Sequence, residues 1–301
     1  MRGKRFRLLT GVTATLALAL TACGGGGGQD QLGGGSDAPE VKVEENVQFE
    51  PGTTMERLQQ ADKIRIGTKF DQPLFGLKVG DTPQGFDVEI AKIISAKMGI
   101  APEKIEWVEA PSKTREEIIR SDRVDMVVAT YTINDERKER VSFAGPYYQA
   151  GQDLMVKSDN NEITGPESLR ETGAKVCSVT GSTPAEEIKK YVDPANLVLF
   201  DVYSKCGDAL RTGQVQAVTT DNVILMGLVN DSDGEFKLVD NAFTEEPYGI
   251  GIKKGDVKFC EFINQSLQQA SEDGSYAKAW EATAGKVANE TPKLPQPQPC
   301  S

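Results

Sequence analysis

A short polar cluster follows an apolar run near the middle of the chain, and its residue types suit an anion. The run covers residues 124–129 and is typical of a strand buried on both faces. Thr130, Thr132 and Arg137 follow it. A guanidinium can bind both oxygens of a carboxylate while hydroxyl groups donate to the remaining lone pairs. The pattern predicts a carboxylate site, although a solvated charge run over 135–140 is the alternative.

Two further candidates follow the strand expected at residues 63–68. Lys69 and Phe70 come directly after it. Ligands of open α/β sheets bind outside the carboxyl ends of the strands. Lys69 at such a position can meet a carboxylate, and Phe70 can pack on the carbon chain of a ligand. Simple exposure of Lys69 is the alternative.

Arg115 is a candidate because of its place at a helix start. It follows a strand expected at 105–108 and begins a short helix that runs to residue 120. A cation gains nothing from the helix dipole at this end. The position therefore suggests another task, although surface arginines are common at helix starts.

The second half of the chain supplies candidates for both charges of an amino acid. Ser182 and Thr183 precede a helix expected at 185–192, where free N–H groups and hydroxyls can bind an anion. An ordinary helix cap explains the same residues. Asp221 ends an expected strand and can accept an ammonium group, unless it only caps the helix that follows. With Arg137 it would complement a zwitterion.

A repeated pattern indicates how these residues are positioned. Residues 114–130 and 205–221 each contain a short helix, a turn and a strand that ends in threonine or just beyond it. An apolar stripe over 86–98 predicts a scaffold helix. The pattern favours an α/β protein with two lobes built alike. Because Arg137 and Asp221 would come from different lobes, the lobes would have to close to bring them together.

Several of these segments resemble a known family. Val124-Asp125, residues 129–132, Glu136-Arg137, Phe143 and residues 146–148 together resemble the polar-amino-acid family of bacterial extracellular solute-binding proteins, which feed ABC importers. The resemblance covers roughly residues 60–285. It is strongest to the glutamate-binding lipoproteins of high-GC Gram-positive bacteria.

The resemblance implies a two-lobed, periplasmic-binding-protein-like α/β fold with a hinge and a ligand cleft between the lobes. It also implies no enzymatic activity, no cofactor, a monomeric chain, and ABC permease membrane subunits as partners. The domains that we expect are lobe 1 at 61–150 and 243–290, lobe 2 at 151–242, and a proline-rich tail at 291–301.

The same resemblance implies L-glutamate as the ligand, with aspartate, glutamine and asparagine as further candidates. It implies that Arg115 binds the side-chain carboxylate of the ligand, and it favours the ligand-binding interpretation of Ser182 and Thr183. The alternatives are an amino-acid sensor lipoprotein that signals to a membrane partner, or a dehydratase-like enzyme on the same fold.

The first residues of the chain indicate export. Residues 1–22 have a basic start and an apolar run too short for a membrane span, so they predict a signal peptide. Cys23 follows small residues that resemble a bacterial lipobox, which implies a lipid anchor at the extracellular face of the membrane. The glycine-rich segment that follows predicts a flexible tether over 23–60. The net charge of −11 disfavours nucleic acid as a partner.

Residue counts limit the chemistry. The chain has no histidine, which excludes Ser-His and Cys-His catalysis and most zinc sites. Five cysteines leave four after lipidation of Cys23, an even number that suits an oxidising compartment. Four cysteines allow three pairings. We favour Cys177 with Cys206 and Cys260 with Cys300, because each pair falls within one expected structural unit.

Overall fold

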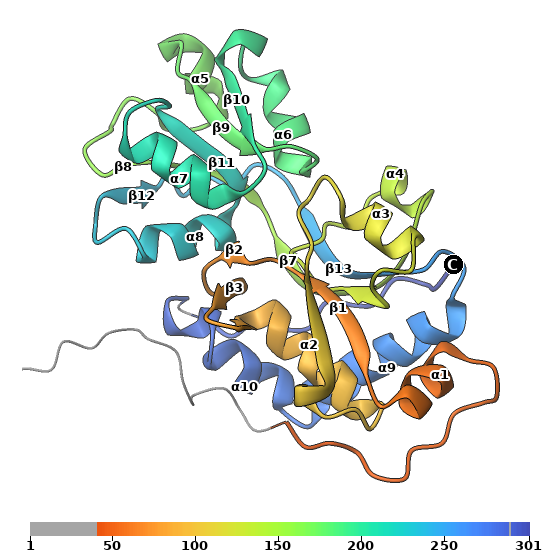
Figure 1. The fold of residues 1–301 in the computed structure, drawn as a ribbon. Helices are drawn as coiled ribbons and strands as arrows, with labels where there is room; N and C mark the ends of the chain where they lie inside the picture. Colours follow the sequence, from red (N-terminus) through yellow and green to blue (C-terminus); the bar gives the residue numbers. More distant parts are fainter. Residues whose placement is uncertain (1–40, 289) are drawn as a thin grey trace, which may run out of the picture. The chain divides into compact units, whose positions relative to one another are not determined.

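The computed structural model describes residues 41–288 and 290–301 (Figure 1). The expected signal peptide, Cys23 and the first part of the tether lie outside the described residues. The helices are α1 (Thr54–Ala61), α2 (Phe86–Lys97), α3 (Arg115–Arg120), α4 (Asp135–Lys138), α5 (Pro166–Thr172), α6 (Thr183–Glu187), α7 (Tyr203–Arg211), α8 (Asn222–Asn230), α9 (Val257–Glu272) and α10 (Ser275–Glu281). Short 3₁₀ turns are η1 (Pro102–Lys104), η2 (Ile188–Lys190), η3 (Pro194–Asn196) and η4 (Ala284–Lys286).

The strands form two five-stranded sheets and one small sheet. They are β1 (Ile64–Thr68), β2 (Asp71–Gln72), β3 (Gly76–Val79), β4 (Thr82–Gln84), β5 (Ile105–Glu109), β6 (Met126–Val127), β7 (Ser142–Ala150), β8 (Gln152–Lys157), β9 (Val176–Val179), β10 (Leu197–Phe200), β11 (Ala217–Asp221), β12 (Phe236–Leu238) and β13 (Glu246–Ile252). The large sheets have the orders β5-β1-β6-β13-β7 and β10-β9-β11-β8-β12, and the small one is β2-β3-β4.

The two large sheets share one design. In the first, β1 is parallel to β5 and β6, and β13 is antiparallel to its neighbours. In the second, β9 is parallel to β10 and β11, and β8 is antiparallel to β11 and β12. We call the body around the first sheet lobe 1 and the body around the second sheet lobe 2 (Figure 1). This is the two-lobed α/β fold that the sequence predicted.

Both sheets are buried on both faces. Along β6 and the residues after it, Met126 and Val128 belong to a core with α2, α9 and α10, whereas Val127 and Ala129 belong to a second core with α3. Successive side chains of a strand point to opposite faces, so the unbroken apolar run fills two cores. The ladder of β6 has only two residues, and Thr130 turns the chain away with a positive φ of 43°.

The chain crosses between the lobes at two adjacent segments. One joins β7 to β8 and the other leads from β12 to β13 (Figure 1). The N–H of Gln152 donates to the hydroxyl of Thr244 at 3.0 Å, and the N–H of Phe243 donates to the carbonyl of Gln152 at 2.9 Å. A side chain on Gly151 would lie 2.8 Å from the Thr244 carbonyl oxygen. Glycine is therefore needed where the two segments meet.

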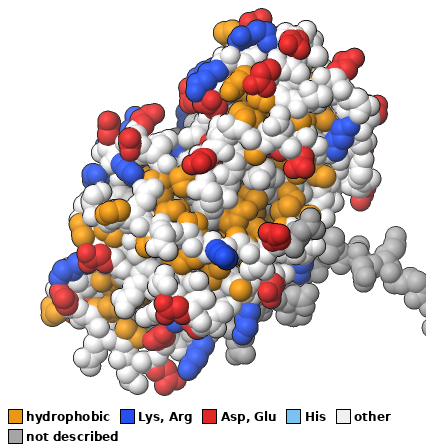
Figure 2. All heavy atoms as spheres, turned by 180° about the vertical axis from the view of Figure 1, so that it is seen from behind, with side chains coloured by type: hydrophobic (Ala, Val, Ile, Leu, Met, Phe, Trp, Pro, Cys, Tyr) orange, Lys and Arg blue, Asp and Glu red, His pale blue; other side chains and the backbone are white. Residues whose placement is uncertain are grey.

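Two disulfides connect the pairs that the sequence analysis favoured. Cys177 in β9 is bonded to Cys206 in α7, and Cys260 in α9 is bonded to Cys300 in the tail. The first disulfide links a strand and a helix of lobe 2, and the second attaches the tail to lobe 1. No helix of residues 41–288 and 290–301 combines the length and apolar character that crossing a membrane requires. Figure 2 shows acidic and basic side chains interspersed on one face.

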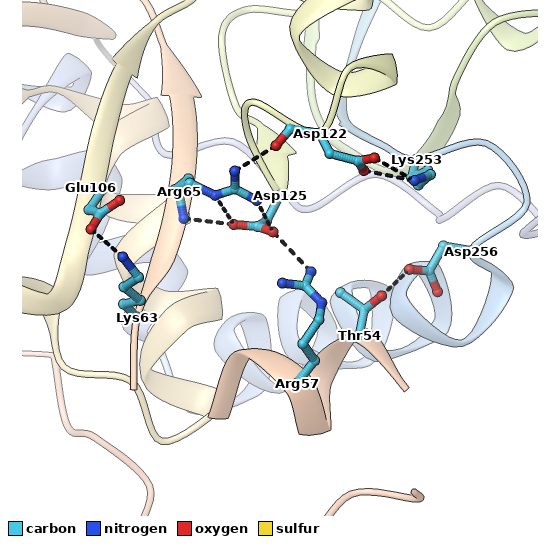
Figure 3. Close-up of polar contacts among 9 residues, drawn as sticks. All are labelled: Thr54, Arg57, Lys63, Arg65, Glu106, Asp122, Asp125, Lys253 and Asp256. Carbon is cyan, nitrogen blue, oxygen red and sulfur yellow. Dashed lines mark hydrogen bonds and ion pairs between the residues drawn. The ribbon is translucent and has the colours of Figure 1, made fainter. Parts of the chain in front are cut away.

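A buried carboxylate anchors the start of the strand that leads to the polar cluster. Asp125 accepts hydrogen bonds from the N–H, Nε and Nη2 of Arg65 at 2.9, 3.1 and 3.0 Å, and from Nη2 of Arg57 at 2.9 Å (Figure 3). Burial acts to raise the pKa of Asp125, but these hydrogen bonds outweigh it and hold the pKa below its ordinary value. The ion cluster fixes β6 at the end opposite to Thr130.

We expect Asp125→Asn to lower the free energy of unfolding by about 2 kcal/mol at neutral pH, because charge-assisted hydrogen bonds are lost from a buried acceptor. The folded-state pKa is depressed, so this stabilisation is present above the unfolded pKa of about 3.9 and is lost as the pH falls. Urea unfolding at neutral and acidic pH measures it.

The control is Glu106→Gln, which breaks the exposed ion pair between Glu106 and Lys63 (Figure 3). Exposed pairs contribute little, so we expect no measurable change. Equal losses in the Asp125 and Glu106 variants would contradict an anchoring role for Asp125.

Candidate functional site

Polar side chains from both lobes converge on one cavity. They follow the carboxyl ends of β5 and β6 in lobe 1 and of β9 and β11 in lobe 2. The cavity has a volume of about 10 Å³, the space of about one water molecule. Its lining consists of Gln72, Ser112, Arg115, Thr130, Thr132, Ser182, Thr183, Pro184, Tyr203, Thr220, Asp221 and Ile224.

Six of the residues that the sequence singled out line this cavity. They are Arg115, Thr130, Thr132, Ser182, Thr183 and Asp221. Arg137 contacts the lining from lobe 1, whereas Lys69 and Phe70 do not belong to it.

Arg115 is the first residue of α3 and has only 2% of its surface exposed. Its Nη1 donates to the carbonyl of Ala129 at 2.9 Å and to that of Thr130 at 3.4 Å. Its guanidinium carbon lies 4.0 Å from the ring centre of Tyr131. Its Nε is buried without a hydrogen-bond partner in the described chain. Arg115 is therefore held by two backbone carbonyls and an aromatic ring, and its Nε is a buried donor without a partner in the described chain.

Arg137 lies at the next corner of the site. The side chain of Asn134 caps the single turn of α4 by accepting from the N–H of Arg137. The guanidinium donates to the carbonyl of Thr132 at 2.6 Å and, across the cleft, to the carbonyl of Gly181 at 3.2 Å. Nε lies 3.5 Å from a carboxylate oxygen of Glu116. Burial, and then repulsion by Arg115, lowers the pKa of Arg137 to about 10.

Asp221 supplies the opposite charge from lobe 2. It stands at the N-cap position of α8, but its side chain makes no capping hydrogen bond. Its Oδ2 accepts from the hydroxyl of Tyr248 at 2.6 Å, and its Oδ1 is buried without a partner in the described chain. Burial, and then repulsion by Glu246, raises the pKa of Asp221 to about 7. Nε of Arg115 and Oδ1 of Asp221 are thus a buried donor and a buried acceptor of opposite charge, beside the neutral unpaired atoms of Gln72, Tyr203 and Thr220 in the same lining.

Hydroxyl groups connect the lobes near Arg137. The hydroxyl of Thr183, at the start of α6, lies 3.2 Å from that of Thr132 in lobe 1 and donates to the Glu246 carboxylate at 2.8 Å. The Ser182 hydroxyl caps α6 by accepting from the N–H of Ala185 at 3.1 Å. Ser182 therefore does the work of an ordinary helix cap while it lines the cavity.

Lys69 and Phe70 differ in burial and in the groups that they contact. Lys69 is 3% exposed, and its ammonium donates to the hydroxyl of Ser112, which lines the cavity, at 2.8 Å. Burial, and then repulsion by Arg115, lowers the pKa of Lys69 to about 7. Phe70 is partly buried, and the ammonium of Lys78 lies 5.0 Å from its ring centre.

Asp87 is a buried residue that sequence reasoning missed. It accepts from the N–H of Thr130 at 2.7 Å and from the hydroxyl of Tyr147 at 2.5 Å. Burial raises the pKa of Asp87 to about 7, although both hydrogen bonds act in the opposite direction. It holds Thr130 in its left-handed conformation. The sequence signal was a carboxylate beside the apolar stripe of α2, which we had interpreted only as scaffold.

Asp71 was also missed, and it joins the lobes outside the cavity. Its carboxylate accepts from the N–H of Tyr203 at 2.7 Å, at the start of α7. The N-cap residue of this helix, Val202, offers no side-chain cap. A carboxylate next to β1 in the sequence therefore caps a helix of lobe 2, an arrangement that requires the lobes to be close.

The cleft chemistry suits binding through charges and hydrogen bonds. Within residues 41–288 and 290–301, no group of three or more His, Cys, Asp or Glu side chains has the geometry of a metal site. The opposed charges of Arg115 and Asp221, with hydroxyls between them, suit a small molecule that carries both an anionic and a cationic group.

The chain is similar to known amino-acid-binding proteins. The glutamate-binding protein GluB of Corynebacterium glutamicum is 36% identical over 286 residues, which cover 91% of this chain and 88% of GluB. The ABC transporter glutamine-binding protein GlnH of Bacillus subtilis is 39% identical over 225 residues, which cover 74% and 81%. A solved structure of an ancestral arginine-binding protein bound to glutamine has 34% identity and a TM-score of 0.69, covering 76% of this chain and 99% of that one.

The relatives are proteins of amino-acid transport, and a family model matches most of the folded part. Residues 64–283 match the bacterial extracellular solute-binding proteins of family 3. The match includes every candidate ligand-binding residue that the sequence predicted. The chain belongs to the bacterial extracellular solute-binding proteins of family 3.

Proposed function

We propose that this chain captures L-glutamate at the extracellular face of the membrane, anchored through Cys23, and delivers it to an ABC permease. Aspartate, glutamine and asparagine are weaker ligands in this proposal. One observation carries it: the cavity wall holds a buried guanidinium donor, Nε of Arg115, and a buried carboxylate acceptor, Oδ1 of Asp221, neither of which has a partner in the described chain.

The main-chain groups of an amino acid fit the groups at the lobe boundary. Asp221 would accept from the α-ammonium, and Arg137 with Thr132 and Thr183 would bind the α-carboxylate. The contact of Arg137 with the Gly181 carbonyl supports this assignment, because it brings the guanidinium to the cleft-facing start of α6.

The side-chain preference follows from unpaired positive charge. Arg115 and Lys69 are 2% and 3% exposed, and neither forms an ion pair within the described chain, although Asp71 and Asp87 act to raise the pKa of Lys69. An isolated buried charge is costly, whereas a carboxylate between two such groups gains charge-assisted hydrogen bonds. A ligand with an anionic side chain should therefore bind beside Arg115 and Lys69 more tightly than a ligand with an amide side chain.

Capture would require the lobes to move. A cavity of about 10 Å³ admits about one water and no amino acid, so the ligand would enter an open form and the lobes would close around it. A ligand favours the closed form only through its higher affinity for that form. The closed form would have the higher affinity because only there would both lobes contact the same ligand.

Titration calorimetry with glutamate, glutamine, aspartate and asparagine tests the ligand. We expect glutamate to bind at least tenfold tighter than glutamine, about 1.4 kcal/mol, because only the carboxylate neutralises Arg115. Arg115→Gln should weaken glutamate binding by about 30-fold or more and remove that preference.

The matched control is Arg120→Gln on the same helix, whose exposed guanidinium pairs with Glu117 and should leave affinity unchanged. A wild-type preference for glutamine would overturn the proposed ligand. Mass analysis should recover the ligand unaltered, as expected for capture without turnover.

Glutamate affinity should fall as the pH drops below about 7, by up to tenfold per unit. The α-ammonium needs the ionised form of Asp221, and burial raises the pKa of Asp221 to about 7 in the free protein. Lys69 and Asp87 have pKa values near 7 as well, so the contribution of Asp221 is the difference between the wild-type and Asp221→Asn profiles. Parallel profiles from pH 5.5 to about 8 would contradict the ammonium assignment.

Asp71→Ala should weaken every amino-acid ligand by the same factor, about fivefold. Asp71 caps α7 across the cleft, and a helix cap contributes about 1 kcal/mol to the closed form. Calorimetry of the ligand series measures it. The control is Asp201→Ala, which removes an exposed carboxylate near the same helix start that pairs with Lys205 within lobe 2. A changed ratio of glutamate to glutamine affinity would show that Asp71 acts on the ligand instead.

A further inference from the structure

One aromatic side chain lies against both arginines of the cleft. Tyr131 is fully buried, and its ring centre lies 4.0 Å from the guanidinium carbon of Arg115 and 5.3 Å from that of Arg137. The face of an aromatic ring attracts cations, and a planar guanidinium stacks on it well. The ring of Tyr131 therefore lies beside two like charges and attracts both of them, although the two charges repel each other.

The two arginine side chains repel each other electrostatically. Arg115 acts to lower the pKa of Arg137, so the two charges oppose each other within one low-dielectric region. Glu116 approaches Arg137 at 3.5 Å, and no carboxylate of the described chain lies within ion-pair distance of Arg115. For Arg115, the ring of Tyr131 and two backbone carbonyls take the place of a counterion.

The ring is held in place from its other sides. A side chain on Gly251 of β13 would lie 2.6 Å from Cε1 of Tyr131, so the absence of a side chain there makes room for the ring. Phe143 packs edge-on with ring centres 4.7 Å apart. The Tyr131 hydroxyl, near Glu116, has no hydrogen-bond partner in the described chain. The ring, and not the hydroxyl, is the part of Tyr131 that faces the two guanidinium groups.

We propose that Tyr131 is a positioning residue, which orients the guanidinium groups of Arg115 and Arg137 so that one amino acid can meet both. The affinity part of this inference rests on the proposed capture of an acidic amino acid. The geometric part does not, because the ring and the guanidinium groups are in contact without a ligand.

The test compares Tyr131→Phe and Tyr131→Leu with Phe143→Leu as a matched control. Phe143 lies in the same core and touches the Tyr131 ring. For the amino acid that binds wild type most tightly, Tyr131→Phe should stay within threefold, and Tyr131→Leu should bind at least 20-fold more weakly. Phe143→Leu should lose as much melting temperature as Tyr131→Leu but keep its affinity within threefold.

An NMR measurement makes the outcome independent of the ligand. The Nε–H resonance of Arg115, assigned through Arg115→Gln, should carry a ring-current shift in wild type and Tyr131→Phe and lose it in Tyr131→Leu. If wild type prefers a ligand other than glutamate while this pattern holds, the proposed function fails and the positioning role stands.

Three outcomes would overturn the positioning role. They are an unshifted Arg115 resonance in wild type, wild-type affinity in Tyr131→Leu, or equal affinity losses in Tyr131→Leu and Phe143→Leu. If Tyr131→Leu does not fold, Tyr131→Met replaces it with the same expected results, because it is closer in length to the ring but lacks its π face.

Discussion

The burial of charge in a nearly closed cleft is the constraint on which the rest of the site depends. Arg115, Lys69 and Asp221 are each at most 3% exposed. Burying a charge without a partner is costly, and here neutral dipoles compensate for part of the cost: two carbonyls for Arg115, a serine hydroxyl for Lys69 and a tyrosine hydroxyl for Asp221. These groups orient each charge without neutralising it, so an opposite charge can still come from a ligand.

The buried charges of opposite sign come from different lobes, so a ligand that pairs with both favours contact between the lobes. Positive groups come from lobe 1, and Asp221 comes from lobe 2. Direct contacts between the lobes include polar ones, such as Arg137 to the Gly181 carbonyl and Asp71 to the N–H of Tyr203, beside the apolar packing of Val223 of α8 against the core of lobe 1. Polar contacts of this kind exchange readily with water, so they suit a cleft that opens and closes.

Each lobe is held together by many internal contacts, whereas only two chain segments join the lobes. The β6 segment begins at Asp125, bound by two arginines, and ends at Thr130, bound by Asp87. Both disulfides lie away from the crossing segments, which meet at Gly151. Each half of the site thus has its own support within one lobe, and the two lobes are joined by two adjacent segments.

The sequence by itself determined the fold class and half of the residues that line the cavity. An unbroken apolar run predicts a strand buried on both faces, and polar residues directly after it predict a ligand edge, because both signals are local. Thr130, Thr132 and Asp221 were found in this way, whereas Arg115 and Thr183 were found from their places at helix starts.

Only the tertiary structure decided which charges are paired and which are free. Asp87 supports Thr130 from 43 residues away, and Asp71 caps a helix 132 residues away. Phe70 lies outside the lining although its sequence position resembles that of the residues that belong to it. The sequence shows that a residue follows a strand, but the direction of its side chain and its distant partners depend on how the strands and helices pack against one another.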